Sequence, residues 1–304
     1  MASIKNTMRN SIPSDKWENK MKIFVTGASG QLGTDLVNLL KTKGYEVFGT
    51  SSKELDITDT YAVKSLIAED KQPNIIIHSA AYTKVDQAEK DSDEAYAVNA
   101  YGTRNVAMAA RACGAKLIYI STDYVFDGTS KVPYNEFAPV SPQSVYGKSK
   151  LAGEQFVREW VPKHYILRTS WVFGKHGSNF VSTMLKLAED RTQLNVVHDQ
   201  FGSPTYTVDL AEFILQLFDK ELYGTYHVSN TGICSWYEFS KEIFYQAGLQ
   251  HIEVNPVTSL EFPRPAPRPA YSVMDHMAIR INGLNDLRHW KEALSGFLME
   301  IGKR

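Results

Sequence analysis

Short apolar runs alternate with stretches of helical periodicity along most of this chain. The runs are rich in β-branched and aromatic residues, which favour buried strands, and they fall at residues 23–25, 45–50, 74–83, 116–126 and 164–174. Between them, leucines recur at helical spacing over residues 32–40, and an alanine-rich helix is expected over 95–113. Strands that alternate with helices predict an α/β fold with a doubly wound parallel sheet.

Ligands of such a sheet bind beyond the carboxyl ends of its strands. These ends carry small or polar residues at 50–52, 80–83, 121–124 and 170–171. Segments after Trp171 are expected to form a smaller second domain that holds the substrate. The polar stretch 1–20 has no apolar segment of the kind found in signal peptides, and we expect a disordered extension there.

The composition is that of an ordinary globular protein and argues against several kinds of partner. With 33 Lys and Arg against 34 Asp and Glu, the net charge of −1 favours neither nucleic acid nor a membrane surface. Cys113 and Cys234 are far apart, and the histidines show no HxxxH or HExxH spacing, so no metal site is predicted. No apolar run approaches the roughly 18 residues of a membrane span. A cytoplasmic protein is expected.

A glycine-rich turn, GASGQLG, follows the first apolar run at residues 27–33. Its glycines let the backbone approach a pyrophosphate, and the helix that follows offers free N–H groups and a favourable dipole. The residues of this turn expected to contact a dinucleotide are Gly27, Gly30, Gln31, Leu32 and Gly33. Ala80, Ala81 and Tyr82, at the end of the third strand, would contact the same cofactor. The alternative is a tight turn without a ligand.

The end of the second strand bears on which dinucleotide binds. NAD-dependent proteins usually carry an acid there, but this chain has hydroxyl groups and Lys53, with no acid before Glu54. Ser51 and Lys53 would attract a 2′-phosphate, and Asp56 and Ile57 would flank the adenine. NADPH is therefore the expected cofactor, NADH stays open, and a plain polar loop is the alternative.

Tyr146 and Lys150 lie four residues apart where a helix is expected to begin, so both side chains can project from one face. A free phenol has a pKa of about 10, and we expect the ammonium group to lower the pKa of Tyr146 toward the range useful for acid–base catalysis. Lys150 would also reach the cofactor ribose, and Thr122 would hydrogen-bond the substrate oxygen. These parts predict reduction of a carbonyl group. The alternative is two surface neighbours at the start of a helix.

With these residues in view, the chain resembles the extended short-chain dehydrogenase/reductases, and within them the dTDP-4-dehydrorhamnose reductases. The resemblance runs in family order from Met21 nearly to the C-terminus. The matching stretches are VTGASGQLG (25–33), AAYTKVDQAE (80–89), ISTDYVFDG (120–128), YGKSKLAGE (146–154), LRTSWVFG (167–174) and DQFGSPTYTVDLA (199–211). The last two are more specific than the glycine triplet.

The resemblance implies that NAD(P)H reduces the C4 keto group of dTDP-4-dehydro-L-rhamnose to give dTDP-L-rhamnose. It implies that Thr122 orients the substrate, that Tyr146 donates a proton and that Lys150 tunes the tyrosine. Asp123 and Tyr124, which follow Thr122 directly, are then expected in the substrate site.

The resemblance also bears on domains and assembly. Because the chain of such proteins crosses back, the cofactor domain is expected at 21–170 with a returning segment near 205–228. The sugar-nucleotide domain is expected at 171–204 and 229–304. Certain family members are dimers bridged by magnesium through glutamates, and no motif here matches those glutamates. Mg²⁺ is therefore unsupported, and a homodimer stays open.

Three later residues are candidates for holding the sugar nucleotide. Gln200 would reach a sugar hydroxyl, or would serve only its turn. Arg268 lies in a proline-rich stretch, where its guanidinium would pair with a pyrophosphate and where the family tends to carry an Arg-Pro pair. A solvated surface loop is the alternative. Trp171 would pack on the sugar or base, or within the core.

Three classes of function fit a chain of this family: the reductase, a related sugar-nucleotide 4-epimerase or 4,6-dehydratase, and a non-catalytic regulatory subunit. A dehydratase would be expected to carry Glu after the Thr-Asp pair, but Tyr124 stands there. A regulatory subunit tends to lose the tyrosine or the lysine, whereas this chain keeps both. The sequence therefore favours the reductase.

Overall fold

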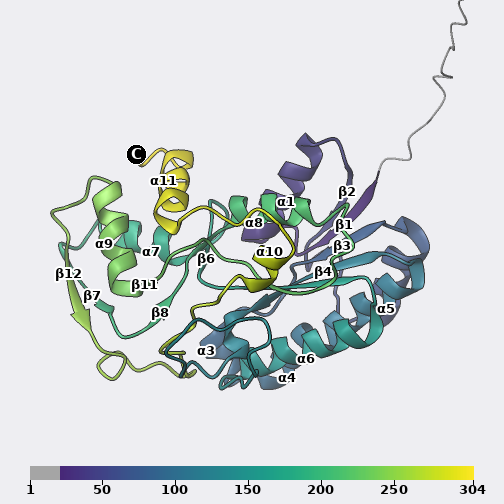
Figure 1. The fold of residues 1–304 in the computed structure, drawn as a ribbon, viewed down its shortest axis with the longest axis horizontal. Coiled ribbons are helices and arrows are strands. Elements are labelled where there is room, and N and C mark those ends of the chain that lie inside the picture. The colour runs from purple at the N-terminus through teal and green to yellow at the C-terminus, as the bar shows by residue number, and fades with distance from the viewer. Residues whose placement is uncertain (1–20) are drawn as a thin grey trace, which may run out of the picture.

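A parallel sheet crosses the N-terminal lobe of the computed structural model, which describes residues 21–304 (Figure 1). Its strands are β1 (Lys22–Thr26), β2 (Glu46–Thr50), β3 (Ile75–His78), β4 (Lys116–Thr122), β5 (His164–Thr169) and β10 (Gly224–His227). Their order in the sheet is β10-β5-β4-β3-β1-β2, and every neighbouring pair is parallel. The predicted doubly wound α/β fold is confirmed.

Helices cover both faces of this sheet because its strands are apolar on both sides. On β1, Ile23 and Val25 belong to the core under one face, while Phe24 belongs to the core under the other. The first face is covered by α1 (Gln31–Thr42) and α8 (Thr207–Gln216), and the second by α5 (Thr103–Cys113) and α6 (Val145–Trp160) (Figure 1). The shorter helical segments of this lobe are α2 (Thr60–Val63), α3 (Val85–Ala88), α4 (Ser92–Tyr96), π-helical stretches at Lys64–Lys71 and Ala97–Gly102, and a 3₁₀ turn at Asp123–Val125.

Three predicted strands end earlier than the apolar runs suggested. The structure ends them at His78, Thr122 and Thr169. The residues beyond these points leave the sheet as loops, and Val172–Phe173 forms a separate short strand, β6. The expected helix over 95–113 is likewise divided among three helical segments. Apolar residues continue past the strand ends into these loops because the loops line a cavity between the lobes.

The second lobe is a small mixed unit with its own aromatic core. Its elements are β6, α7 (Phe180–Leu187), β7 (Gln193–Val197), β8 (Phe201–Gly202), β9 (Thr205–Tyr206), β11 (Cys234–Ser235), α9 (Trp236–Gln246), β12 (Glu253–Val257) and α11 (Trp290–Glu300). Phe173, Phe239 and Phe297 are buried at its centre and pack ring against ring. Aliphatic side chains such as Leu194, Ile243 and Leu294 complete this core around the rings.

The chain crosses between the lobes more than once. The returning segment supplies α8 and β10 to the sheet lobe, and α10 (Met277–Ile281) packs beside β10. Ile279 and Leu287 join the same core as Ile23, so part of the region expected to form the sugar-nucleotide domain also supports the sheet. The extension expected at 1–20 lies outside the described residues. Among residues 21–304, no helix is both long and apolar enough to cross a membrane.

A buried ion pair ties α6 to the sheet. Glu154 on α6 accepts hydrogen bonds from Nε and Nη2 of Arg168 on β5, at 2.9 and 2.8 Å. It also accepts one from Ser121 on β4, at 2.6 Å. Burial works to raise the pKa of Glu154, but the hydrogen bonds and charge of Arg168 outweigh it and keep this pKa below its ordinary value. The carboxylate is therefore charged in the core at neutral pH.

Glu154→Gln should destabilise the fold by about 3 kcal/mol, because it leaves a buried guanidinium without its counter-charge. Urea unfolding at pH 7 would measure this loss. Because the pKa of Glu154 is lower in the folded protein than the unfolded value of 4.5, its carboxylate stabilises the fold at pH values above 4.5. This contribution is lost as the pH falls through the folded pKa, so the free energies of unfolding of wild type and variant should converge in acid. Glu159→Gln, on the exposed side of the same helix, is the matched control. Equal stability of both variants at pH 7 would contradict the assignment.

Candidate active site

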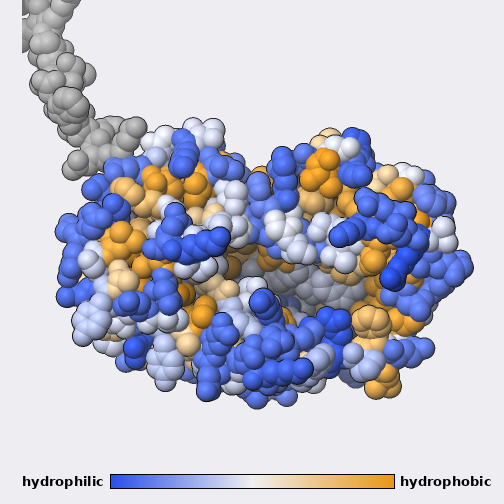
Figure 2. All heavy atoms as spheres, turned by 180° about the vertical axis from the view of Figure 1, so that it is seen from behind, coloured by the Kyte–Doolittle hydropathy of each residue, from blue (hydrophilic) through white to orange (hydrophobic). Residues whose placement is uncertain are grey.

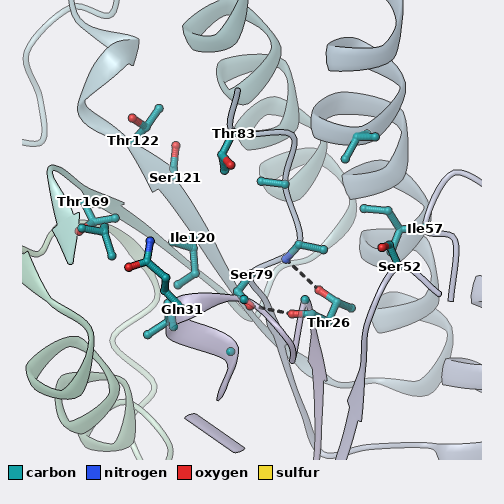
Figure 3. A pocket seen from close by; sticks show the side chains of 18 of the residues that line it. Thr26, Gln31, Ser52, Ile57, Ser79, Thr83, Ile120, Ser121, Thr122 and Thr169 are labelled. Carbon is teal, nitrogen blue, oxygen red and sulfur yellow. Dashed lines mark hydrogen bonds between the residues drawn. The ribbon is translucent and has the colours of Figure 1, made fainter. Parts of the chain in front are cut away.

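A hollow lies between the two lobes, on the face shown in Figure 2. It contains a cavity of about 520 Å³ at the carboxyl ends of the sheet strands. Of the residues predicted from the sequence, those lining this cavity are Gly27, Gly30, Gln31, Leu32, Gly33, Ser51, Asp56, Ile57, Ala80, Ala81, Thr122, Asp123, Tyr124, Tyr146 and Trp171. Figure 3 looks into the cavity, with Thr122 and Thr169 toward one end and Ser52 and Ile57 toward the other.

The glycine turn between β1 and α1 is shaped for close approach of a ligand. Gly27 has φ +69°, and a Cβ there would press against the backbone of Ala80. A Cβ on Gly33 would meet the carbonyl oxygen of Gly27. Gly30 precedes α1, and no side chain of the described chain caps this helix, which has no acid in its first turn. The free amide end therefore fits a pyrophosphate.

The end of β2 differs from the simple hydroxyl-and-lysine surface that the sequence predicted. The carboxylate of Glu54 turns back and accepts hydrogen bonds from the N–H and the hydroxyl of Ser51, both at 2.7 Å. These bonds lower the pKa of Glu54. Lys53 does not line the cavity, whereas Asp56 and Ile57 do. The Glu54 carboxylate thus accepts the two Ser51 hydrogen bonds that the sequence analysis expected a 2′-phosphate to accept.

The end of β3 is held by a buried polar network. His78 contacts the hydroxyl of Thr26 at 2.7 Å and that of Thr103 at 3.0 Å. Burial lowers the pKa of His78 to about 3, so the ring is neutral. Ala80 and Ala81 line the cavity beyond it, but Tyr82 does not. The Ser79 hydroxyl donates to the Thr26 carbonyl oxygen at 2.7 Å, as Figure 3 shows. The N–H of Ala80 donates to the Thr26 hydroxyl at 3.3 Å.

Tyr82 instead braces the wall behind the cavity. Its backbone N–H donates to the side chain of the buried Asn99 at 2.8 Å. The same Asn99 side chain donates to the Tyr82 carbonyl oxygen and to the Ser149 hydroxyl, each at 3.0 Å. The Tyr82 hydroxyl donates to Asp91 at 3.2 Å. The structure thus gives Tyr82 a bracing role through its backbone.

Thr122 and Asp123 stand where β4 ends. The Thr122 hydroxyl donates to Oδ1 of Asp123 at 3.0 Å and accepts the N–H of Tyr124 at 3.2 Å. Burial raises the pKa of Asp123 to about 6, although the Ser272 and Thr122 hydroxyls offset part of the shift. Three adjacent side chains of different chemistry therefore meet one wall of the cavity.

Tyr146 enters the same wall from the start of α6. Ser144 caps this helix through the N–H of Gly147, and a Cβ on Gly147 would collide with the Tyr124 carbonyl oxygen, so α6 begins close against the β4 loop. The Tyr146 ring meets the Tyr124 ring edge to face, with centroids 5.5 Å apart. Burial raises the pKa of Tyr146 to about 12, with Thr122 opposing this and Asp123 adding to it. The prediction that this pKa is lowered is wrong for the protein alone, because desolvation dominates the shift and Lys150 is not among the groups that move this pKa.

Lys150 lies behind the cavity and does not line it. Its ammonium donates to the Ile120 carbonyl oxygen at 2.7 Å and sits over the Tyr119 ring, 4.2 Å from the centroid. Burial lowers the pKa of Lys150 to about 7, and the charge of Glu154 works in the opposite direction. The predicted contact with a ribose stays a prediction.

A second cavity of about 270 Å³ adjoins the first on the side of the smaller lobe. Tyr124 and Trp171 line both cavities, and Gln200 and Arg268 line the second. Trp171 has the left-handed φ of +47°, and its ring stacks on Trp236 at a centroid distance of 3.5 Å. Strain of this kind persists only where surrounding packing imposes it.

The structure also reveals residues that sequence inspection missed. Trp236, Glu54 and Asp86 each contact a predicted site residue or its neighbour. Trp236 lies 65 positions after Trp171 in an ordinary amphipathic helix, so no local signal marks it. Asp86 is visible only as part of the AAYTKVDQAE stretch. In residues 21–304, no group of three or more His, Cys, Asp or Glu side chains is placed to hold a metal ion.

Comparisons with known proteins agree with this geometry. A Bacillus subtilis (strain 168) protein named spore coat polysaccharide biosynthesis protein SpsK is 49% identical over 279 residues, covering 92% of this chain and 97% of that protein. The dTDP-4-dehydrorhamnose reductase of Streptomyces griseus is 44% identical, with 93% of each chain covered. A crystal structure of dTDP-4-dehydrorhamnose reductase from Bacillus anthracis in complex with NADP matches with a TM-score of 0.90 and 50% identity, over 92% of this chain and 99% of that one.

The family described as RmlD substrate binding domain matches residues 21–302, which is nearly all of the described chain. The resemblance noted in the sequence is thereby confirmed. With its sheet, its glycine turn and its two adjoining cavities, this chain belongs to the dTDP-4-dehydrorhamnose reductase family.

Proposed function

We propose that this chain reduces the C4 keto group of dTDP-4-dehydro-L-rhamnose to give dTDP-L-rhamnose, with NADPH as the hydride donor. The observation that carries the proposal is the wall shared by the two cavities. Tyr124 and Trp171 line both, and Tyr146, Thr122 and Asp123 lie at the same end of the larger one. A dinucleotide in one cavity and a sugar nucleotide in the other would meet beside these side chains.

The residues of the wall support a simple reduction. When bound, the nicotinamide supplies the hydride that forms the new C4–H bond. The hydroxyl of Tyr146 gives its proton to the carbonyl oxygen as negative charge develops there, so the C=O double bond becomes a C–OH single bond. Because burial raises the pKa of Tyr146 to about 12, the phenol is in its donor form at neutral pH. Thr122 would hold the same oxygen once its hydroxyl turns from Asp123.

Lys150 supports the tyrosinate that proton transfer leaves behind. It follows Tyr146 by one turn of α6, and burial lowers its pKa to about 7, so it exchanges protons readily near neutrality.

A dehydratase needs a second acid at the position after Asp123, and Tyr124 stands there. Burial raises the pKa of Tyr124 above that of a free phenol, so this side chain is a poor acid. Elimination is therefore disfavoured relative to reduction.

The proposal is tested by NADPH consumption across a panel of 4-keto nucleotide sugars that differ in base and in sugar stereochemistry. We expect oxidation of NADPH with dTDP-4-dehydro-L-rhamnose and formation of one equivalent of the 4-hydroxy product. Protein that is purified with tightly bound NAD, or that oxidises no NADPH with any member of the panel, would reject it.

Tyr146→Phe should lower kcat by about 10²–10⁴-fold, because it removes only the proton donor. The dissociation constant for NADPH, measured by fluorescence titration, should stay within about twofold of wild type since the ring is retained. Tyr245→Phe, at an exposed position on α9, is the control. If Tyr146→Phe keeps more than about a tenth of wild-type kcat, with chemistry rate-limiting, another group is the main acid.

The pH dependence should identify Lys150 directly. In the wild type, kcat/KM should fall as the pH rises through about 7, since the ammonium loses its charge there. Lys150→Met should be slower and lack this decline, whereas Lys148→Met, exposed on the same helix, should keep it. The same pH profile in wild type and Lys150→Met would remove the lysine from the mechanism.

Glu54→Gln should shift cofactor preference toward NADPH. The carboxylate takes both Ser51 donors and would repel a 2′-phosphate, while the amide would not. We expect the KM for NADPH to fall about two- to fivefold relative to that for NADH, as for a single exposed charge. Glu69→Gln, an exposed acid that does not line the cavity, is the control. An equal change for both cofactors would mean that Glu54 does not face the phosphate.

A further inference from the structure

A proline-rich strap, residues 262–268, borders the second cavity. Its prolines alternate with other residues, so that only Phe262, Arg264, Ala266 and Arg268 carry a backbone N–H. Such a segment cannot be held by an ordinary ladder of backbone hydrogen bonds, and its restricted backbone favours an extended course. Something else must fix its position beside the cavity.

One carboxylate supplies the polar attachment. Asp86, on α3 of the sheet lobe, pairs through Oδ2 with Nη2 of Arg264 at 2.8 Å and through Oδ1 with Nη2 of Arg268 at 2.9 Å. The N–H of Ala266 donates to Oδ1 at 3.3 Å. Among residues 21–304, every hydrogen bond and ion pair that leaves the strap ends on Asp86. A residue of one lobe thus holds a segment that comes from the other.

The attachment reaches toward the reacting centre. The Arg268 guanidinium lies 5.9 Å from the centroid of the Tyr124 ring, and that ring meets Tyr146 edge to face. Two guanidinium groups against one carboxylate leave a net positive charge at the border of the cavity. Planar, paired N–H donors suit a phosphate group. Arg264 and Arg268 both line the second cavity.

We propose that Asp86 is a positioning residue, which holds Arg264 and Arg268 in the orientation that receives the diphosphate of the nucleotide-sugar substrate. The inference rests on the proposed function for the identity of that diphosphate. Arginine side chains are long and flexible, so ordering them before the substrate arrives lowers the entropy cost of binding. The Asp86 carboxylate also repels a diphosphate. That repulsion is weak, because the carboxylate is already saturated by cationic donors in a partly solvated position.

The test compares binding of dTDP, the nucleotide part of the substrate, to the full chain saturated with NADPH. Asp86→Asn should raise the dissociation constant for dTDP about tenfold, as for one lost charge-assisted hydrogen bond. The dissociation constant for NADPH and kcat at saturating sugar nucleotide should stay within about twofold. Asp86→Glu should recover part of the loss because it keeps the charge. Asp93→Asn, an exposed acid with the same charge change, should bind dTDP like the wild type.

A double-mutant cycle separates positioning from general damage to the fold. If Asp86 acts through the arginines, Asp86→Asn should change dTDP affinity by less than about twofold in an Arg264→Ala/Arg268→Ala background, which lacks both of the side chains that Asp86 holds. The same tenfold loss in both backgrounds would overturn the proposal, and so would tighter dTDP binding by Asp86→Asn. If the wild-type protein binds dTDP but reduces no 4-keto sugar, the proposed reaction is wrong. The double-mutant cycle measures only dTDP binding, so it would still decide the role of Asp86.

Discussion

The buried ion pair between Glu154 and Arg168 is the constraint on which the active-site geometry depends. It joins α6 to β5 and, through Ser121, to β4. Tyr146 stands at the start of α6 and Thr122 at the end of β4, so the ion pair sets the distance between the Tyr146 phenol and the end of that strand. A charged pair at this depth is costly to form, and here it gives a helix and two strands one fixed relative position.

Burial then determines the protonation of the side chains around the cavity. The same desolvation raises the pKa of Tyr146 to about 12, lowers that of Lys150 to about 7 and raises that of Asp123 to about 6. In each case the neutral form gains, because the walls of the cavity replace water. A neutral phenol, one helical turn before a lysine whose pKa is near 7, is suited to giving a proton to a carbonyl oxygen rather than to taking one away.

The second cavity depends on contacts between segments that are distant in sequence. The chain leaves the sheet lobe after Trp171, returns with β10 and α10, and brings the strap back to Asp86 on α3. Trp171 itself is held in a left-handed conformation against Trp236. The border between the two cavities is therefore assembled by both lobes, and its shape depends on how they pack together.

Local patterns in the sequence were sufficient for the fold class, the glycine turn and the spacing of Tyr146 and Lys150, because strand–turn–helix order and helical periodicity act over a few residues. They could not show that Glu54 turns back onto Ser51 or that Lys150 sits behind the cavity. Nor could they show that burial reverses the expected shift of Tyr146. Those outcomes depend on which groups are desolvated and which distant partners meet, so only the tertiary structure decided them.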